Sequence, residues 1–267
     1  MPETLFIIKS GGNVIDDERL LSQFLDDFAA LPGRKILIHG GGKIASRIGA
    51  QMGLEPQYVD GRRITDAATL QLVTMVYGGL LNKQIVAALQ ARNCNALGLT
   101  GADGNLIAAK HRPAGKIDFG WVGDPAPELV RTAGLTALLE AGFCPVFASL
   151  THDNAGNMLN TNADTIASVL AQALSGMYTV KLLYCFEQDG VLEKMPDGTT
   201  QVVPVLHPEK RDAMQKNGDL SGGILPKIDN AFAAANAGAA VVWIGASGRV
   251  GAFAGTDVVP GTVIQLP

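Results

Sequence analysis

Residues 35–52 read KILIHGGGKIASRIGAQM, and the order of residue types in this stretch decides the fold class. A short apolar run is followed by three glycines and then by apolar residues at helical spacing. An apolar run with little polar alternation is typical of a strand buried on both faces of a parallel sheet. Glycines after such a strand let backbone N–H groups approach an anion, and a following helix adds its positive end. The stretch therefore predicts a strand, a ligand-binding turn and a helix.

The same order recurs along the chain, which predicts a doubly wound α/β fold. Further short apolar runs predict buried strands at 5–8, 96–99, 145–150, 179–186 and 239–244. Amphipathic stretches between the strands predict helices at 18–31, 44–52, 67–92, 127–141, 164–174 and 227–237.

The length of 267 residues fits one large domain over residues 1–267, or two lobes that share a sheet. No linker rich in Ser or Pro divides the chain. The small-residue turn at Ser175 and Gly176 is the best candidate for a division, because an apolar helix ends there and a new strand begins. Two Asp-Gly pairs in residues 187–208 predict a hairpin that projects from the sheet.

Composition excludes several classes of partner and location. The formal net charge is −4 and the sequence has no Lys/Arg cluster, so neither a nucleic-acid surface nor a polybasic membrane patch is expected. No stretch reaches the ~18 uninterrupted apolar residues of a membrane span, and the N-terminus lacks the basic region of a signal peptide. The three cysteines lie in apolar surroundings without metal-ligand spacing, which indicates a cytoplasmic protein. The expected ligand is a small molecule.

Glycines follow predicted strands or precede predicted helices at three places. The first strand ends in Lys9-Ser10-Gly11-Gly12, the second ends in the triple glycine quoted above, and Gly222-Gly223 stands just ahead of Lys227. Together they predict a phosphate or carboxylate site. The Walker A motif requires Ser or Thr after its Lys, and the Rossmann fingerprint GxGxxG is absent, so neither a P-loop enzyme nor a hydride-transfer enzyme is supported.

Residues 157–164 read NMLNTNAD just before an apolar helix, and they contain more short polar residues than helix capping requires. Amides can both donate to and accept from a polar substrate, and a carboxylate can hold lysine side chains, so a site with Asn160 and Asp164 is expected. The four histidines have no partners at metal-ligand spacing and are interpreted as structural; no metal site is predicted. The serines lack a GxSxG elbow, so a nucleophilic triad has no support.

An arginine pair, Arg62 and Arg63, precedes the longest predicted helix. Such a pair is either a solvated surface feature or a bidentate partner for a substrate carboxylate, and the pattern alone leaves both open. The helix itself contains Gly78 and Gly79, and each interior glycine costs ~1 kcal/mol relative to alanine. Such glycines suit close packing, for example against the same helix of a second subunit.

These segments, taken in order, resemble the amino acid kinase family, and within it the N-acetylglutamate kinases. The resemblance runs over nearly the whole chain, from KSGGN at residue 9 through HGGG at 39, GRRIT at 61, NTNAD at 160 and GGILPK at 222 to Gly261-Thr262. It implies an open three-layer α/β/α sandwich with a mainly parallel central sheet. It also implies that residues 1–175 bind an acyl-glutamate and that residues 176–267 bind ATP.

The resemblance assigns roles residue by residue. Lys9 and Lys227 would stabilise the transferring phosphoryl group, and Asp164 would organise both lysines. The acyl-glutamate contacts would be Gly41, Gly42, Arg63 and Asn160. The phosphate-facing backbone would be that of Gly11 and Gly12, and the nucleotide site would comprise Glu187, Gln188, Asp189, Gly190, Val191, Leu192, Asp219, Leu220 and Ser221.

The implied reaction is ATP-dependent phosphorylation of the γ-carboxylate of N-acetyl-L-glutamate in arginine synthesis, with Mg²⁺ carried by the nucleotide. The alternatives are the same reaction on N-succinyl-L-glutamate and a non-catalytic nucleotide or amino-acid sensor on this fold. The family usually has Thr-Asp-Val before the nucleotide-loop glycine, where this chain has Phe186-Glu187-Gln188. The chain also starts directly at its first strand, without the N-terminal helix of arginine-inhibited hexameric members, so a homodimer without arginine feedback is expected.

Overall fold

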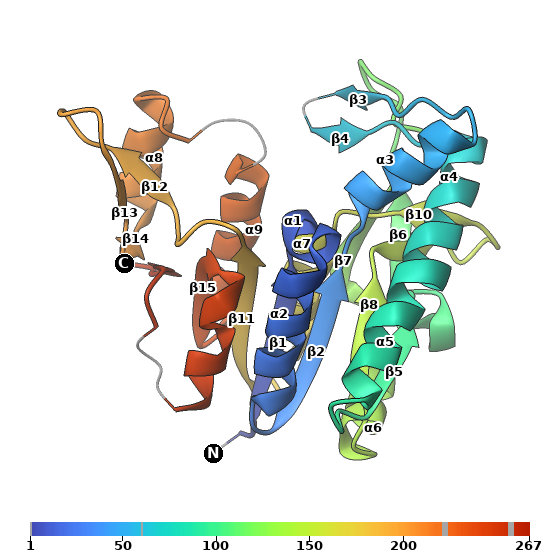
Figure 1. Cartoon of the computed structure of the whole chain (residues 1–267), viewed down its shortest axis with the longest axis horizontal. Coiled ribbons are helices and arrows are strands. Elements are labelled where there is room, and N and C mark those ends of the chain that lie inside the picture. The colour runs from blue at the N-terminus through green and yellow to red at the C-terminus, as the bar shows by residue number, and fades with distance from the viewer. Residues whose placement is uncertain (1, 60, 221–223, 256–258) are drawn as a thin grey trace.

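A computed structural model describes residues 2–59, 61–220, 224–255 and 259–267. Its centre is an eight-stranded sheet of order β14-β16-β15-β11-β1-β2-β8-β5, in which only the β15–β16 pairing is antiparallel (Figure 1). The predicted mainly parallel sheet is thereby confirmed. The strands are β1 (Thr4–Ser10), β2 (Arg34–His39), β5 (Ala96–Leu99), β8 (Cys144–Ala148), β11 (Thr179–Phe186), β14 (Val205–Leu206), β15 (Val241–Ala246) and β16 (Thr262–Ile264).

Helices cover both faces of this sheet, because successive side chains of a strand point to opposite faces. In β1, Leu5 and Ile7 pack in the apolar cluster of one face, and Phe6 and Ile8 pack in the cluster of the other. The first face is covered by α6 (Thr132–Glu140), α7 (Ala163–Leu174) and α9 (Ile224–Asn236), and the second by α2 (Glu18–Ala30), α5 (Asn82–Gln90) and the 3₁₀ helix η3 (Ser247–Ala254). The three-layer α/β/α sandwich is confirmed.

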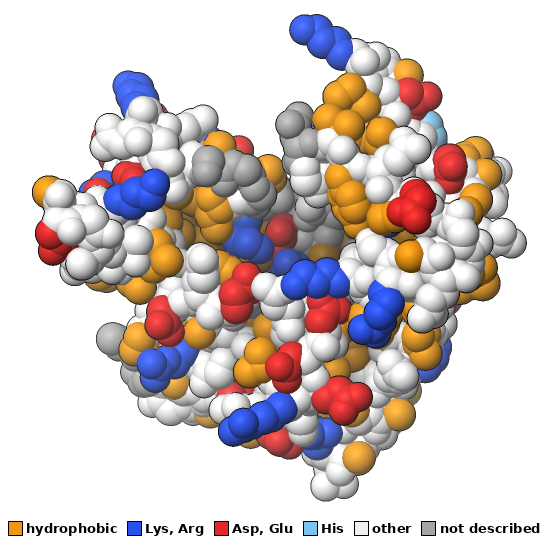
Figure 2. Space-filling view, turned by 45° about the horizontal axis from the view of Figure 1, so that its top comes forward, with side chains coloured by type: hydrophobic (Ala, Val, Ile, Leu, Met, Phe, Trp, Pro, Cys, Tyr) orange, Lys and Arg blue, Asp and Glu red, His pale blue; other side chains and the backbone are white. Residues whose placement is uncertain are grey.

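Smaller elements rise beyond the carboxyl ends of the parallel strands, on two sides of a hollow (Figures 1 and 2). On one side stand α3 (Gly42–Gln51), α4 (Ala67–Val73), the hairpin of β3 (Tyr58–Val59) and β4 (Arg62–Arg63), and the sheet of β6 (Ile107–His111), β7 (Gly123–Val130), β9 (Leu150–His152) and β10 (Met158–Asn160). On the other side stand β12 (Leu192–Lys194), β13 (Thr200–Val202) and α8 (Pro208–Lys216). The short segments α1 (Gly12–Asp16) and η2 (Asp103–Asn105), with the π-helix η1 (Thr74–Leu81) between α4 and α5, complete the described elements.

Several boundaries differ from the sequence prediction. Residues 127–130, expected in a helix, end strand β7, and the helix starts only at Thr132. The predicted strand 145–150 is divided between β8 and β9, which belong to different sheets. The predicted helix 67–92 is continuous to Gln90, but residues Thr74–Leu81 form a π-helix around the two glycines. The hairpin expected in 187–208 is confirmed: β12 and β13 pair antiparallel around Asp197-Gly198.

Gly78 and Gly79 were expected to permit close packing, for example against a second subunit. A Cβ atom on Gly78 would lie 3.4 Å from Leu150 and 3.6 Å from Thr100, which are ordinary contact distances, so Gly78 faces the interior of the chain. Gly79 faces open space. The segment 67–90 is long and apolar enough to cross a bilayer. However, 44% of its apolar 18-residue stretch is buried inside the protein, as in a core helix.

Candidate active site

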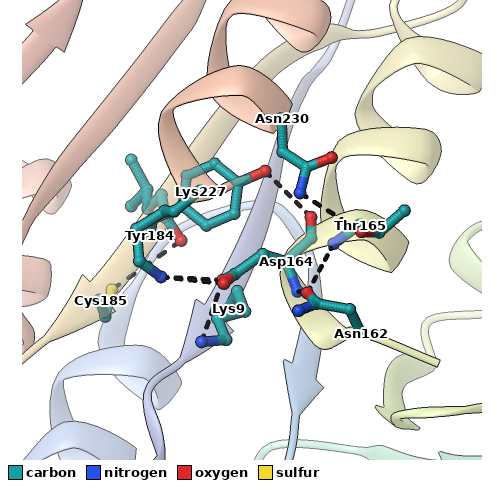
Figure 3. A network of polar contacts seen from close by, with 9 residues as sticks. Lys9, Asn162, Asp164, Thr165, Tyr184, Cys185, Lys227 and Asn230 are labelled. Carbon is teal, nitrogen blue, oxygen red and sulfur yellow. Dashed lines mark hydrogen bonds and ion pairs between the residues drawn. The ribbon is translucent and has the colours of Figure 1, made fainter. Parts of the chain in front are cut away.

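Two lysines converge on one carboxylate at the base of the hollow. Lys227 Nζ donates to Asp164 Oδ1 at 2.9 Å and to Oδ2 at 3.1 Å, and Lys9 Nζ lies 3.0 Å from Oδ1 (Figure 3). The three residues come from β1, α7 and α9, and they are separated by more than 60 positions in sequence. The trio predicted from sequence is thus assembled in space.

Each member of this trio is placed by its secondary structure. Lys9 lies near the carboxyl end of β1 and continues the face of Leu5 and Ile7, so its side chain points toward α7. Asp164 stands in the first turn of α7, where the side chain of Asn162 caps the helix by accepting from the amides of Asp164 and Thr165. The polar stretch at the start of α7 therefore supplies both the cap and the carboxylate that the two lysines contact.

The two lysines favour the charged form of Asp164. Burial alone would raise the pKa of Asp164, but the fields of Lys9 and Lys227 and the hydrogen bonds from both lysines bring it down to about 2. Burial lowers the pKa of Lys227, and the positive charge of Lys9 adds to this, while Asp164 acts in the opposite direction. One carboxylate between two ammonium groups leaves net positive charge facing the hollow.

The glycine turns lie beside this centre, and one glycine of each turn could not carry a side chain without a shift of its neighbours. Gly41 has φ of 155°, and a Cβ atom there would lie 2.3 Å from Leu81 Cδ1. A Cβ atom on Gly11 would approach the carbonyl oxygen of Cys185 to 3.0 Å. Gly42 opens helix α3, whose first amides have no partner within the helix. Together with Lys9 and Asp164, Gly12, Gly41 and Gly42 line a cavity of about 200 Å³.

Arg63 is buried, with only 8% of the residue exposed, and several contacts hold its side chain in place. Its Nη2 donates to the carbonyl oxygen of Gly42 at 2.8 Å, to Ser46 Oγ at 2.8 Å and to the hydroxyl of Tyr58. The guanidinium also lies over the Tyr58 ring, 4.7 Å from its centroid. Arg63 is therefore a fixed cation that borders the glycine turn, whereas its neighbour Arg62 is exposed.

Arg63 and Asn160 line one cavity of about 420 Å³ that reaches from Tyr58 and Tyr77 to Asn230 of α9. Asn160 Nδ2 donates to Thr65 Oγ1 at 3.0 Å, which orients the amide and fixes its oxygen as an acceptor. This cavity and the smaller one beside the lysines share Gly42, Tyr77 and residues 160–162. A small molecule held by Arg63 can therefore reach the lysine centre.

Tyr58 and Tyr77 are among the residues of this cavity that were not predicted from sequence. Tyr77 lies on the π-helix and lines both cavities, and its ring lies near the Cβ directions of Gly41 and Gly42. The only sequence signal was the Tyr-Gly-Gly break in an otherwise apolar helix. π-helical turns frequently occur at functional sites.

The residues expected at a nucleotide site differ in their exposure to solvent. Glu187, Gln188 and Asp189 are exposed in the loop after β11, on the same edge of the sheet as the lysines. Val191 and Leu220 are buried in the core, and the Val191 amide already donates to Thr262 Oγ1. The remaining members are buried Gly190 and half-buried Leu192 and Asp219; Ser221, like Gly222 and Gly223, lies outside the described residues.

His39 is fully buried behind the glycine turn and is structural, as predicted. Its Nδ1 donates to the carbonyl oxygen of Gly40 at 2.8 Å, and its Nε2 accepts from Asn82 Nδ2 at 3.1 Å, a pattern that requires the neutral ring. Asn82 Nδ2 also donates to the carbonyl oxygen of Val146. Burial lowers the pKa of His39 to about 4.

This depressed pKa predicts acid lability. Below pH 6.5 the unfolded chain binds a proton at His39, whereas the folded chain binds it only near pH 4. The stability contribution that is present above pH 6.5 is therefore lost as the pH falls from 6.5 to about 4. We expect a loss of about 2 kcal/mol between pH 7 and pH 5. Urea unfolding at both pH values measures it. His39→Gln should reduce the pH dependence by this amount and His111→Gln should not; equal pH dependence in all three proteins would contradict the assignment.

The sequence profile of the amino acid kinase family matches residues 4–245. Two proteins named acetylglutamate kinase are similar over most of their length. That of Phocaeicola vulgatus is 50% identical over 97% of this chain and 99% of its own, and that of Cytophaga hutchinsonii is 52% identical over 91% of each chain.

Solved structures share the fold at lower identity. N-acetylglutamate synthase from Neisseria gonorrhoeae, complexed with coenzyme A and N-acetyl-glutamate, superposes with a TM-score of 0.79 at 24% identity, over 99% of this chain and 59% of that one. Carbamate kinase from Giardia lamblia, bound to AMP-PNP, superposes with a TM-score of 0.66 at 16% identity, over 100% and 99% of the two chains. By its sequence match, its relatives and its fold, this chain belongs to the amino acid kinase family.

Proposed function

We propose that the chain transfers the γ-phosphoryl group of ATP to the γ-carboxylate of N-acetyl-L-glutamate and forms N-acetyl-L-glutamyl 5-phosphate in arginine synthesis. The observation that carries the proposal is the junction of two cavities, one bordered by Arg63 and the other by Lys9 and Asp164. The relatives at about half identity, named acetylglutamate kinase, support the same reaction.

The chemistry needs positioning and positive charge rather than a general base. A γ-carboxylate is ionised at neutral pH and is itself the nucleophile. Arg63 would bind the α-carboxylate as a charged fork, and the Asn160 amide oxygen would accept from the substrate N–H. Lys9 and Lys227 would then neutralise the negative charge that builds on the equatorial oxygens of the phosphoryl group.

ATP would approach from the side of the β11–β12 loop, so residues 1–175 would serve mainly as the acyl-glutamate lobe and residues 176–267 as the ATP lobe. Asp164 is not a metal ligand in this arrangement, because both of its oxygens accept from lysine. Among the described residues no cluster of three His, Cys, Asp or Glu side chains could hold a metal ion. Any Mg²⁺ would therefore be carried by the nucleotide phosphates.

A second candidate substrate is N-succinyl-L-glutamate. The Arg63 cavity adjoins a wider one of about 700 Å³ that is lined by Arg62, Arg112 and Lys116. Arg112 is paired with Asp124, whereas Arg62 and Lys116 form no ion pair with another described residue. Two such cations beside the acyl end would suit an additional carboxylate. The sensor hypothesis is less well supported, because a sensor does not require two lysines held at one carboxylate.

A coupled ADP-release assay with Mg-ATP tests the proposal, with N-acetyl-, N-succinyl- and free L-glutamate as acceptors. We expect the highest kcat/KM with N-acetyl-L-glutamate and little activity with free glutamate, which lacks the acyl amide. A preference for the succinyl compound that Arg62→Ala abolishes would select the second candidate. Inactivity with all three acceptors would refute the kinase reaction.

We further propose a cytoplasmic homodimer. What supports the location is three free, buried cysteines. What supports the dimer is the outer face of the helix 67–90, where Met75 is 48% exposed and Leu80 is 43% exposed beside open Gly79.

Sedimentation should give a species of twice 27.9 kDa. Leu80→Glu places a charge on this face and should shift the equilibrium toward monomer. Leu20→Glu, at an equally exposed leucine of α2, is the matched control and should leave the dimer intact. A monomeric wild type, or a dimer unaffected by Leu80→Glu, would exclude this interface.

A further inference from the structure

The ammonium of Lys227 lies near two aromatic rings that the phosphoryl-transfer scheme does not use. Its Nζ is 5.4 Å from the ring centroid of Tyr184 and 5.8 Å from that of Phe186. These residues alternate on β11 and therefore share a face of the sheet. Tyr184 is the register partner of Lys9 on the neighbouring strand β1, so both lysines approach Asp164 across this face (Figure 3).

Tyr184 also contacts the third member of the centre. Its hydroxyl donates to the backbone carbonyl oxygen of Asp164 at 3.1 Å, and its side chain has no solvent exposure. Tyr184 thus binds the helix turn that carries Asp164 and presents its ring to Lys227. Phe186 occupies the position where the sequence departs from the Thr-Asp-Val pattern.

We propose that Tyr184 and Phe186 are positioning residues: they hold Lys227 charged and aimed at Asp164, and Tyr184 additionally fixes the turn of Asp164. The inference rests on the proposed kinase function. The rings also belong to the apolar core cluster of their face of the sheet, a role that leucine could fill. Leucine has no electron-rich face, however, and an aromatic ring attracts a desolvated ammonium through its quadrupole.

The charge state of Lys227 distinguishes two roles of the aromatic rings: positioning the lysine, or only filling space in the apolar core. The titratable groups that face Lys227 are Lys9 from β1, Asp164 from α7 and Tyr184 from β11; Cys185 of β11 points to the opposite face of the sheet but lies within the electrostatic reach of Lys227. Burial raises the pKa of Tyr184 and of Cys185, so both keep their protons where Lys227 titrates. Loss of an aromatic face would favour neutral lysine and lower the pKa of Lys227 further.

The test is the pH dependence of kcat at saturating ATP and N-acetyl-L-glutamate, for Tyr184→Leu, Phe186→Leu and Tyr184→Phe. Tyr178→Leu is the matched control, because Tyr178 belongs to the same core cluster at the far end of the sheet. We expect the alkaline limb, assigned to Lys227, to move down by about 0.5–1 pH unit in Tyr184→Leu and in Phe186→Leu. Their kcat at pH 7.5 should fall about 5–20-fold with KM nearly unchanged. Tyr184→Phe keeps the ring and should retain the wild-type limb.

The proposal is overturned if folded Phe186→Leu and Tyr184→Leu keep the wild-type limb and lose no more kcat than Tyr178→Leu. Should Tyr184→Leu fail to fold, Phe186→Leu decides the question alone. NMR titration of the Lys227 ammonium without substrate measures the same pKa difference. If the wild type is inactive and the pKa of Lys227 is the same in the wild type and the leucine variants, both proposals are refuted. If the wild type is inactive but the pKa of Lys227 is lower in the leucine variants, only the kinase function is refuted.

Discussion

Lys9→Met and Lys227→Met should each lower kcat by about 10²–10³ while the protein stays folded, which is the scale for losing one preorganised charge donor. Methionine retains much of the length and apolar stem of lysine. In either single variant Asp164 keeps the other lysine at about 3 Å, so no buried charge is left without a partner. Steady-state kinetics of the purified variants, with circular dichroism as the folding check, measure this loss.

Lys43→Met is the matched control for the lysine pair. Lys43 follows the glycine turn directly, but its side chain is 68% exposed and pairs loosely with Asp16 at 3.9 Å. We expect its kcat to stay within about twofold of wild type, because an exposed ion pair contributes little. Near-normal kcat in Lys9→Met or Lys227→Met would remove that residue from the mechanism.

Arg63→Ala should raise KM for N-acetyl-L-glutamate by about 10–100-fold and change KM for ATP by less than threefold. A charged hydrogen-bonded contact to a carboxylate is worth ~1.5–3 kcal/mol, and it acts largely in the ground state. Initial-rate kinetics with each substrate varied in turn separate the two effects. The control is Arg47→Ala, because Arg47 is an exposed arginine of α3, the helix that starts at Gly42. A defect selective for ATP would place Arg63 on the wrong side of the transferred group.

The sequence predicted six of the eight strands of the central sheet because buried parallel strands are short, continuous apolar runs; it missed β14 and β16, which are only two and three residues long. It also pointed to Lys9, Asp164 and Lys227, because each stands next to a glycine turn or a polar helix start at a strand or helix end. Their convergence on a single carboxylate needed the structure, since no local pattern states which strands become neighbours.

The elements that escaped sequence reasoning have physical reasons for doing so. Strands β9 and β10 are three residues long and mix apolar with polar side chains, too short for a periodic signal. Helix α8 is charged nearly all round and buries only Met214, so it lacks an apolar face. The π-helix Thr74–Leu81 gives no periodic signal of its own, and the sequence pattern shows only a pair of glycines within a long apolar helix.

In the proposed reaction a carboxylate attacks the phosphoryl group, and trapping the product tests this step most directly. An acyl phosphate reacts with hydroxylamine to give a hydroxamate, whereas a phosphate ester or free phosphate does not. With Mg-ATP and N-acetyl-L-glutamate, we predict one hydroxamate formed for each ADP released, and loss of both products in Lys227→Met. Release of ADP with inorganic phosphate and no hydroxamate would show that water, and not the γ-carboxylate, is the acceptor, and would contradict the account.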